Sequence, residues 1–279
     1  MNKKIIVTKA SGLTEPFSIL KLRNSLTRAK ASPEEINGIV EILLPKLYQG
    51  ISTKKIYSEA FRLLREYSKH HAARYYLKRG MMELGPSGYP FENFVGELFK
   101  HQGYAVEVGL IMQGKCVTHE IDVSAKRENQ FMLMECKYRN QPGISVDVKT
   151  PLYIYSRFQD LLDNSLLKNE KQSFVGWIVT NAKFTTDAIA YGSCKSMNLL
   201  GWNYPINNSL KDMIDKSGLY PITCLTSLTH HEKQWLLTNN YVLAKDIYNK
   251  ENILRKAGVK EIRMKAVLEE GAKLCASKD

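Results

Sequence analysis

The sequence predicts an α/β fold, in which a mixed β-sheet flanked by helices follows one mainly helical segment and precedes a smaller one. Two observations support this. Apolar residues recur at helical spacing near both ends of the chain, whereas the middle contains alternating or continuous apolar runs typical of strands. A chain of 279 residues is long enough for two or three domains of roughly 100–150 residues. We therefore expect three domains, at residues 1–88, 89–225 and 226–279.

The first domain is expected to begin with a short β-hairpin and to continue as helices. The apolar run Ile5–Thr8 is followed by the turn residues Ser11 and Gly12, which predicts two short strands. Ser32-Pro33 is typical of an N-cap and the first residue of a helix, and Ser52 predicts a further helix start. The sequence from Gly85 to Pro90 cannot continue a helix, so we interpret it as a linker.

The second domain is predicted to contain helices around a central sheet. A helix over Phe91–Gln102 precedes the strands. The predicted strands are Ala105–Ile111, Val117–Ser124, Phe131–Tyr138 and Phe174–Val179, and the later helices are Val148–Leu167 and Thr185–Lys195. From Thr226 the chain is again helical, with Gly258 between two short helices.

Composition limits the classes of protein that are possible. No window approaches the ~20 apolar residues that span a bilayer, and there is no signal-peptide pattern, so we expect no membrane association. Five scattered cysteines without a C-x-x-C pair argue against a disulfide framework and a zinc ribbon, and favour a cytoplasmic location. The net charge is +12, and residues 1–90 hold 16 lysines and arginines against seven acidic residues. This excess favours a nucleic-acid partner, although a basic protein without one is the alternative.

Asp122, Glu135 and Lys137 form the candidate catalytic group. Strand alternation places Glu135 and Lys137 on one face, and a five-residue turn, from Lys126 to Gln130, brings Asp122 beside them. Two carboxylates at one point suit a hard divalent cation such as Mg²⁺ or Mn²⁺, which can deliver hydroxide to a phosphodiester. Lys137 could stabilise the developing negative charge. The alternative is a salt bridge at the end of a strand.

Four short motifs occur in order along this domain: Phe91-Glu92, Gly103-Tyr104, Ile121-Asp122 and Glu135-Cys136-Lys137. The series resembles the Mrr-like branch of the PD-(D/E)xK restriction-endonuclease superfamily. The resemblance implies a restriction-endonuclease-like fold and an endodeoxyribonuclease, with Glu92, Asp122, Glu135 and Lys137 as catalytic residues and with Asp122 and Glu135 as metal ligands. The chain departs from the family at His119-Glu120, where glycines are usual.

Three further features of this domain need a separate interpretation. Glu97 is a second acid on the first helix, but it lies on a different face from Glu92, and a solvated surface position is the alternative. His119 could assist proton transfer or could be structural. The sequence from Gly109 to Cys116 nearly matches a phosphate-binding loop, but it continues as a strand where that motif requires a helix, so we interpret it as a hairpin.

The N-terminal domain carries a second resemblance. Its matching residues include Val7, Lys9 and Gly12, then Lys21-Leu22, and the run from Leu47 to Thr53. They resemble the ATP-cone, a nucleotide-sensing domain of ribonucleotide reductases and their repressor. The resemblance implies binding of ATP or dATP, with Lys9, Lys21 and Arg23 as phosphate partners. Ala10 and Ser11 replace an arginine and an aspartate of the family, so a cone that instead holds DNA is the alternative.

The C-terminal stretch from Trp235 to Leu268 is similar to helix-hairpin-helix modules, which present helix N-termini to DNA phosphates. A helical cap on the nuclease domain or a dimerisation element would also fit. Together these features predict a cytoplasmic, Mg²⁺-dependent endonuclease of restriction or genome-defence type that acts on double-stranded DNA as a homodimer, with ATP or dATP as a nucleotide effector. The alternatives are a repair or junction-resolving nuclease, and a non-catalytic nucleotide-sensing DNA-binding regulator.

Overall fold

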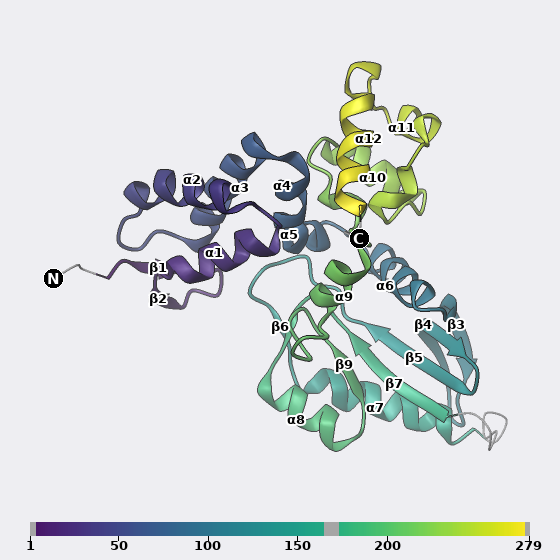
Figure 1. The fold of residues 1–279 in the computed structure, drawn as a ribbon. Helices are drawn as coiled ribbons and strands as arrows, with labels where there is room; N and C mark the ends of the chain where they lie inside the picture. Colours follow the sequence, from purple (N-terminus) through teal and green to yellow (C-terminus); the bar gives the residue numbers. More distant parts are fainter. Residues whose placement is uncertain (1–3, 165–172, 277–279) are drawn as a thin grey trace. The chain divides into compact units, whose positions relative to one another are not determined.

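The computed structural model describes residues 4–164 and 173–276 and divides the chain into two compact units (Figure 1). One unit is discontinuous in sequence and combines residues 1–81 with residues 220–279, whereas the other is formed by residues 82–219. The sequence does not predict that the two helical ends of the chain share a unit. The three predicted domain ranges stay a prediction.

In residues 4–81, the N-terminal part of the discontinuous unit is a β-hairpin followed by five α-helices, with the 3₁₀ helix η1 (Leu44–Lys46) between α2 and α3. Strands β1 (Ile6–Thr8) and β2 (Thr14–Pro16) pair antiparallel, and the turn contains Gly12 at a φ of 82°. Ser18, Ser32 and Ser52 each accept a backbone hydrogen bond as the N-cap of a helix, which confirms the predicted starts at Ser32 and Ser52. The helices are α1 (Ile19–Arg28), α2 (Pro33–Leu43), α3 (Thr53–Tyr67), α4 (Lys69–Tyr75) and α5 (Leu77–Met82).

The C-terminal part of the same unit is a set of short helices around the longer helix α12 (Glu261–Cys275). The others are α10 (His230–Thr238) and α11 (Glu251–Lys256), with the 3₁₀ turns η3 (Ile222–Cys224) and η4 (Ala244–Ile247). Helix α12 packs against α4. The buried side chain of Arg74 on α4 donates to the carbonyl oxygens of Lys273, Leu274 and Ala276 at 3.1–3.4 Å. A cation at the C-terminal end of a helix is favourable, because the unpaired carbonyls there carry negative partial charge.

The second unit is built on one five-stranded mixed sheet in the order β3-β4-β5-β7-β9. Strands β3, β4 and β5 are antiparallel neighbours, whereas β7 and β9 continue the sheet in parallel. The bounds are β3 (Ala105–Gln113), β4 (Thr118–Arg127), β5 (Gln130–Cys136), β7 (Ser173–Val179) and β9 (Asn198–Leu200). The predicted mixed sheet flanked by helices is confirmed.

Helices cover the two faces of this sheet (Figure 1). Helix α6 (Tyr89–His101) packs on β3 and β4, while α7 (Lys149–Leu162) packs on β7 and α8 (Thr186–Cys194) on β9. The last residues of the helix predicted over Val148–Leu167 lie outside the described residues. A small parallel pair, β6 (Ser145–Val146) with β8 (Lys183–Phe184), and helix α9 (Leu210–Ser217) were not predicted.

The β3-β4-β5 meander differs from the prediction at the β4-β5 turn and agrees with it at the β3-β4 turn. The turn between β4 and β5 consists of only Glu128 and Asn129, with Glu128 at a φ of 52°, so the predicted five-residue turn is too long. The sequence from Gly109 to Cys116 forms the end of β3 and a turn into β4, as the hairpin interpretation expects. A side chain at Gly114 would meet the carboxylate of Asp160, which explains why a glycine stands there.

Candidate active site

The candidate site lies where β4 and β5 separate. Their pairing ends at Val123 and Met134, one position before Asp122 and Glu135 would face each other. On the other edge of β4, the described pairing with β3 also passes over Asp122, opposite Gly109, which has a φ of 73°. The Asp122 carboxylate replaces a ladder carbonyl by accepting a hydrogen bond of 2.6 Å from the amide of Cys136. Because the β4-β5 ladder stops here and the β3-β4 ladder skips Asp122, the Asp122 carboxylate can take the place of a backbone partner.

Glu135 is the buried acid of the site, with 5% of its surface exposed. One of its oxygens pairs with the ammonium of Lys137, and the other accepts from the guanidinium of Arg157 at 2.6 Å. The backbone of Lys137 is fixed because its amide donates to Val179 at 2.8 Å and its carbonyl accepts from the buried hydroxyl of Thr180 at 2.6 Å. The site therefore holds one buried carboxylate between two cations.

The two other predicted acids are electrostatically strained. Burial, and then the negative charge of Glu135, raise the pKa of Asp122 to about 6, although the Cys136 amide, Lys137 and Arg157 oppose this. Burial, followed by repulsion from Asp122, raises the pKa of Glu92 on α6 to about 7. Glu92 is thus close enough to share the field of the site, and the structure brings all four predicted residues into one electrostatic group.

The donor set can be tested for its fit to a divalent cation. Among the residues that the structure describes, no three His, Cys, Asp or Glu side chains form a group that could hold a metal ion. Two carboxylates on adjacent strands nevertheless match Mg²⁺, which is commonly held by one or two carboxylates and keeps several waters. Burial is the larger cause of the raised pKa of Asp122, and the second cause, the negative charge of Glu135, would be relieved by a cation between the two acids. Asp122 and Glu135 would hold the ion.

Arg157 and Asp160 on α7 were missed by the sequence analysis. Besides Glu135, the Arg157 guanidinium contacts the carbonyl of Glu120 on β4. Asp160 accepts from the amides of Cys116 and Val117 at 2.8 and 3.2 Å and pairs with His119 at 2.8 Å. His119 is therefore part of a structural anchor. A basic residue beside the apolar stripe of α7 was the only available signal for Arg157, and it is a weak one.

The remaining predicted residues fall into two groups. Glu97 pairs with Lys100 at 2.7 Å on the exposed side of α6, which agrees with the solvated alternative. In the N-terminal hairpin region, Lys9 and Lys21 converge on Glu15, at 2.7 and 3.0 Å, and lower the pKa of that acid. Arg23 does not join them, because its guanidinium donates to Asn37 at 2.9 Å.

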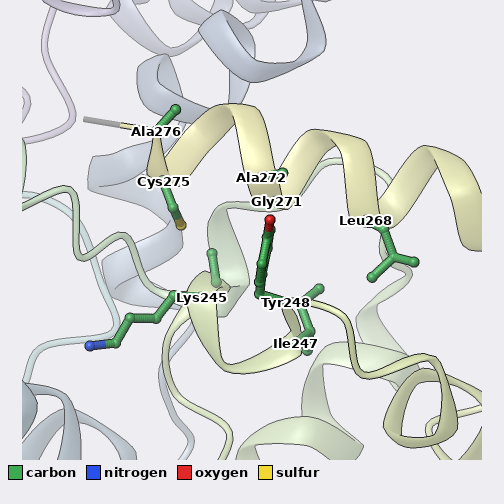
Figure 2. Close-up of a pocket in the computed structure, with 9 residues that line it drawn as sticks. Lys245, Ile247, Tyr248, Leu268, Gly271, Ala272, Cys275 and Ala276 are labelled. Carbon is green, nitrogen blue, oxygen red and sulfur yellow. The ribbon is translucent and has the colours of Figure 1, made fainter. Parts of the chain in front are cut away.

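A hollow of about 440 Å³ lies elsewhere, between α12 and η4 in the C-terminal part (Figure 2). Its lining is mostly small or apolar and includes Ile247, Leu268 and Gly271, with Cys275 at one end. Burial raises the pKa of the Cys275 thiol to about 11, so this thiol is not an activated nucleophile. The hollow contains none of the predicted catalytic residues.

The second unit is an α/β fold whose five-stranded mixed sheet carries acids on two neighbouring strands and a lysine two residues after the second acid. The chain belongs to the AF1548-like family. It is 32% identical over 182 residues to an uncharacterised protein of Archaeoglobus fulgidus, covering 64% of this chain and 99% of that protein. Residues 220–275 match the model of the family described as AF1548-like, C-terminal.

Two solved structures are similar to the chain. The crystal structure of AF1548, a protein of unknown function, is 30% identical, with a TM-score of 0.56 over 68% of this chain and 98% of that chain. The MspJI restriction endonuclease in complex with a 27-mer oligonucleotide is 13% identical, with a TM-score of 0.34 over 75% of this chain and 44% of that chain. A likeness as low as the second does not establish a shared fold.

No helix among the described residues is both long and apolar enough to cross a membrane.

Proposed function

We propose that this protein is a divalent-cation-dependent endonuclease that hydrolyses phosphodiester bonds of double-stranded DNA, of restriction or genome-defence type. The observation that carries the proposal is the placement of Asp122 and Glu135 on two strands that separate at these residues, with Lys137 on Glu135. A structural salt bridge does not need a second, repelling carboxylate whose pKa is raised by burial and by its neighbour.

The residues of the site have distinct roles in this proposal. Asp122 and Glu135 hold Mg²⁺ or Mn²⁺, which when bound polarises the phosphodiester and lowers the pKa of water. Lys137, anchored through its backbone to β7, places a positive charge where negative charge grows on the phosphate. Glu92, with a pKa raised to about 7, can accept or return a proton near neutral pH.

The direct test is cleavage of supercoiled plasmid DNA by the full chain. Nicking or linearisation is expected with Mg²⁺ or Mn²⁺, and none with a chelator. Unmodified, methylated and branched DNA should be compared, since preference for branched DNA would favour a junction-resolving nuclease. Failure to cut any of these substrates, together with salt-dependent binding, would contradict the proposal and favour a non-catalytic regulator. Cutting of both strands by one centre per chain would favour a homodimer, which sedimentation in the presence of DNA can detect.

The N-terminal hairpin region is proposed to bind the phosphates of ATP or dATP through Lys9 and Lys21. The two ammonium groups already converge on one acid, so a triphosphate could replace Glu15 as their common partner. Arg23 is proposed as a third partner, and it would have to leave Asn37. The alternative is that the N-terminal segment binds DNA instead of a nucleotide, through the same basic residues.

We expect millimolar ATP or dATP, without divalent cation, to raise the melting temperature by a few degrees, because a ligand at about ten times its Kd stabilises the folded state by about 1.4 kcal/mol. Lys9→Ala and Lys21→Ala should each lose most of this shift. Arg62→Ala is the control, because Arg62 is an exposed cation on α3 that pairs with Glu59 and Glu66. An equal loss in all three variants, or no shift in the wild type, would contradict nucleotide binding.

A further inference from the structure

Arg157 occupies the gap that the separated strands leave. One nitrogen of its guanidinium donates to Glu135 on β5 at 2.6 Å, and another contacts the backbone carbonyl of Glu120 on β4. The side chain is 15% exposed, and the ring of Tyr153, one turn earlier on α7, lies 5.7 Å from the guanidinium carbon. Arg157 therefore spans the two strands that carry the predicted metal ligands, and it can still be reached from solvent.

Helix α7 holds this guanidinium on a rigid support. Phe158, the next residue, packs so closely on Gly176 of β7 that a side chain at Gly176 would collide with its ring. Asp160, three residues after Arg157, anchors the β3-β4 turn through two amides and His119. The helix backbone is thus fixed both to β7 and to the β3-β4 turn, so a change of partner by Arg157 would involve its side chain rather than a movement of the helix.

The charges around Glu135 create a conflict with a bound cation. Both of its oxygens are already satisfied, one by Lys137 and the other by Arg157. A divalent cation between Asp122 and Glu135 would need one of these oxygens and would lie beside two positive side chains. The Arg157 guanidinium, which is planar and forms paired hydrogen bonds, is equally suited to a carboxylate and to a phosphate.

We propose that Arg157 competes with the divalent cation for Glu135 and, when it is displaced, binds a phosphate of the DNA backbone. This inference rests on the proposed function, because it requires that Asp122 and Glu135 hold a cation. It makes cation binding and DNA binding mutually supportive: the cation frees Arg157 for the phosphate, and a phosphate keeps Arg157 away from Glu135. Linkage requires each ligand to raise the affinity for the other by the same factor.

The first test measures Mn²⁺ affinity of the DNA-free protein by calorimetry or electron paramagnetic resonance. Arg157→Gln keeps a donor for the Glu120 carbonyl but removes the charge, and it should bind Mn²⁺ about tenfold more tightly. Arg157→Lys keeps the charge and should bind Mn²⁺ like the wild type. Arg127→Gln is the matched control, since Arg127 also lies beside an aromatic ring, that of Tyr104, and donates to a backbone carbonyl, but at the far end of β4.

The second test measures binding of a labelled DNA duplex in chelator and in Ca²⁺, a hard cation with the same preference for oxygen ligands. Arg157→Gln should weaken binding about tenfold in Ca²⁺, because a hydrogen bond between charged groups is lost, and should leave binding in chelator unchanged. Thermal melts confirm that each variant is folded.

Equal or weaker Mn²⁺ binding by a folded Arg157→Gln variant would overturn the competition with the cation. An equal loss of DNA affinity in Ca²⁺ and in chelator would overturn the exchange of partners. Both results leave the nuclease proposal intact if the wild type binds Mn²⁺ and cuts DNA. If the wild type binds no Mn²⁺, the metal site itself is wrong, and the role of Arg157 is overturned with it.

Discussion

Glu135→Gln is expected to lower cation-dependent DNA cleavage by about 10³-fold or more, because under the proposed function it removes the buried carboxylate that would hold the metal. The same substitution is expected to destabilise the protein. Glutamine keeps the size of the side chain but leaves Lys137 and Arg157 without their shared anion, and losing such charged hydrogen bonds costs about 1–3 kcal/mol. Plasmid cleavage and thermal unfolding of the purified variant measure the two effects.

Glu97→Gln is the matched control for this experiment. Glu97 lies on α6 and pairs only at the surface, with Lys100, so its replacement should leave the cleavage rate unchanged. The role assigned to Glu135 fails if Glu135→Gln cuts DNA within tenfold of the wild-type rate.

Asp122→Asn is expected to abolish cleavage as well, yet to stabilise the metal-free protein. Asparagine can still accept the hydrogen bond from the Cys136 amide, while the repulsion with Glu135 and the cost of burying a charge disappear. A shift from an ordinary aspartate pKa of about 3.9 to about 6 corresponds to roughly 3 kcal/mol, and partial solvent exposure reduces this to about 1–2 kcal/mol. If Asp122 served only the structure, neutralising it would not be expected to stabilise the folded protein.

The stabilisation should depend on pH with a definite sign. Because the pKa of Asp122 is raised in the folded state, its ionisation destabilises the folded protein as pH rises through about 4 to 6. The advantage of Asp122→Asn should therefore be full at pH 8 and absent at pH 4. Tryptophan fluorescence can follow the unfolding, since Trp177 and Trp202 lie in the unit that contains the sheet. A loss of stability at pH 8 would contradict the arrangement of charges described above.

Asp160→Asn provides the opposite case in the same unit. Its pKa is held well below the ordinary value, first by His119 and further by hydrogen bonds from Cys116 and Val117, so the charged form is the favoured one. Neutralising it should destabilise the protein at neutral pH, and this destabilisation should diminish in acid. Opposite signs for two aspartates of one sheet unit would separate a strained site from a structural anchor.

Much of the sheet and the core of the candidate site could be predicted from the sequence. Period-two alternation around Glu135 and Lys137 fixes their shared face, and a short connection fixes the neighbour strand that carries Asp122. These are local relations, which a single sequence contains. The position at which the β4-β5 ladder ends, at Val123 and Met134, is not a local relation, because it depends on which side chains fill the gap between the two strands.

The residues that were missed act over long sequence separations. Arg157 reaches Glu135 across 22 residues and Glu120 across 37, and the rotation of α7 on the sheet decides which side chain arrives there. Arg74 is a clearer example, since its carbonyl partners lie about 200 residues away on α12. An arginine in a helix gives no indication of whether its partner is solvent, a carboxylate or the end of another helix.

The clamp of Arg74 on the last turn of α12 also has a consequence for synthesis of the chain. During translation, residues 1–81 leave the ribosome well before the carbonyls that accept hydrogen bonds from Arg74, which lie about 200 residues further along the chain. The contiguous unit at residues 82–219 can therefore fold before residues 220–279, which complete the unit of residues 1–81, have been synthesised. A chain that stops after the sheet would therefore carry a complete sheet unit joined to an N-terminal segment whose interface with residues 220–279 is missing, and such an exposed interface is a target for chaperones and proteases.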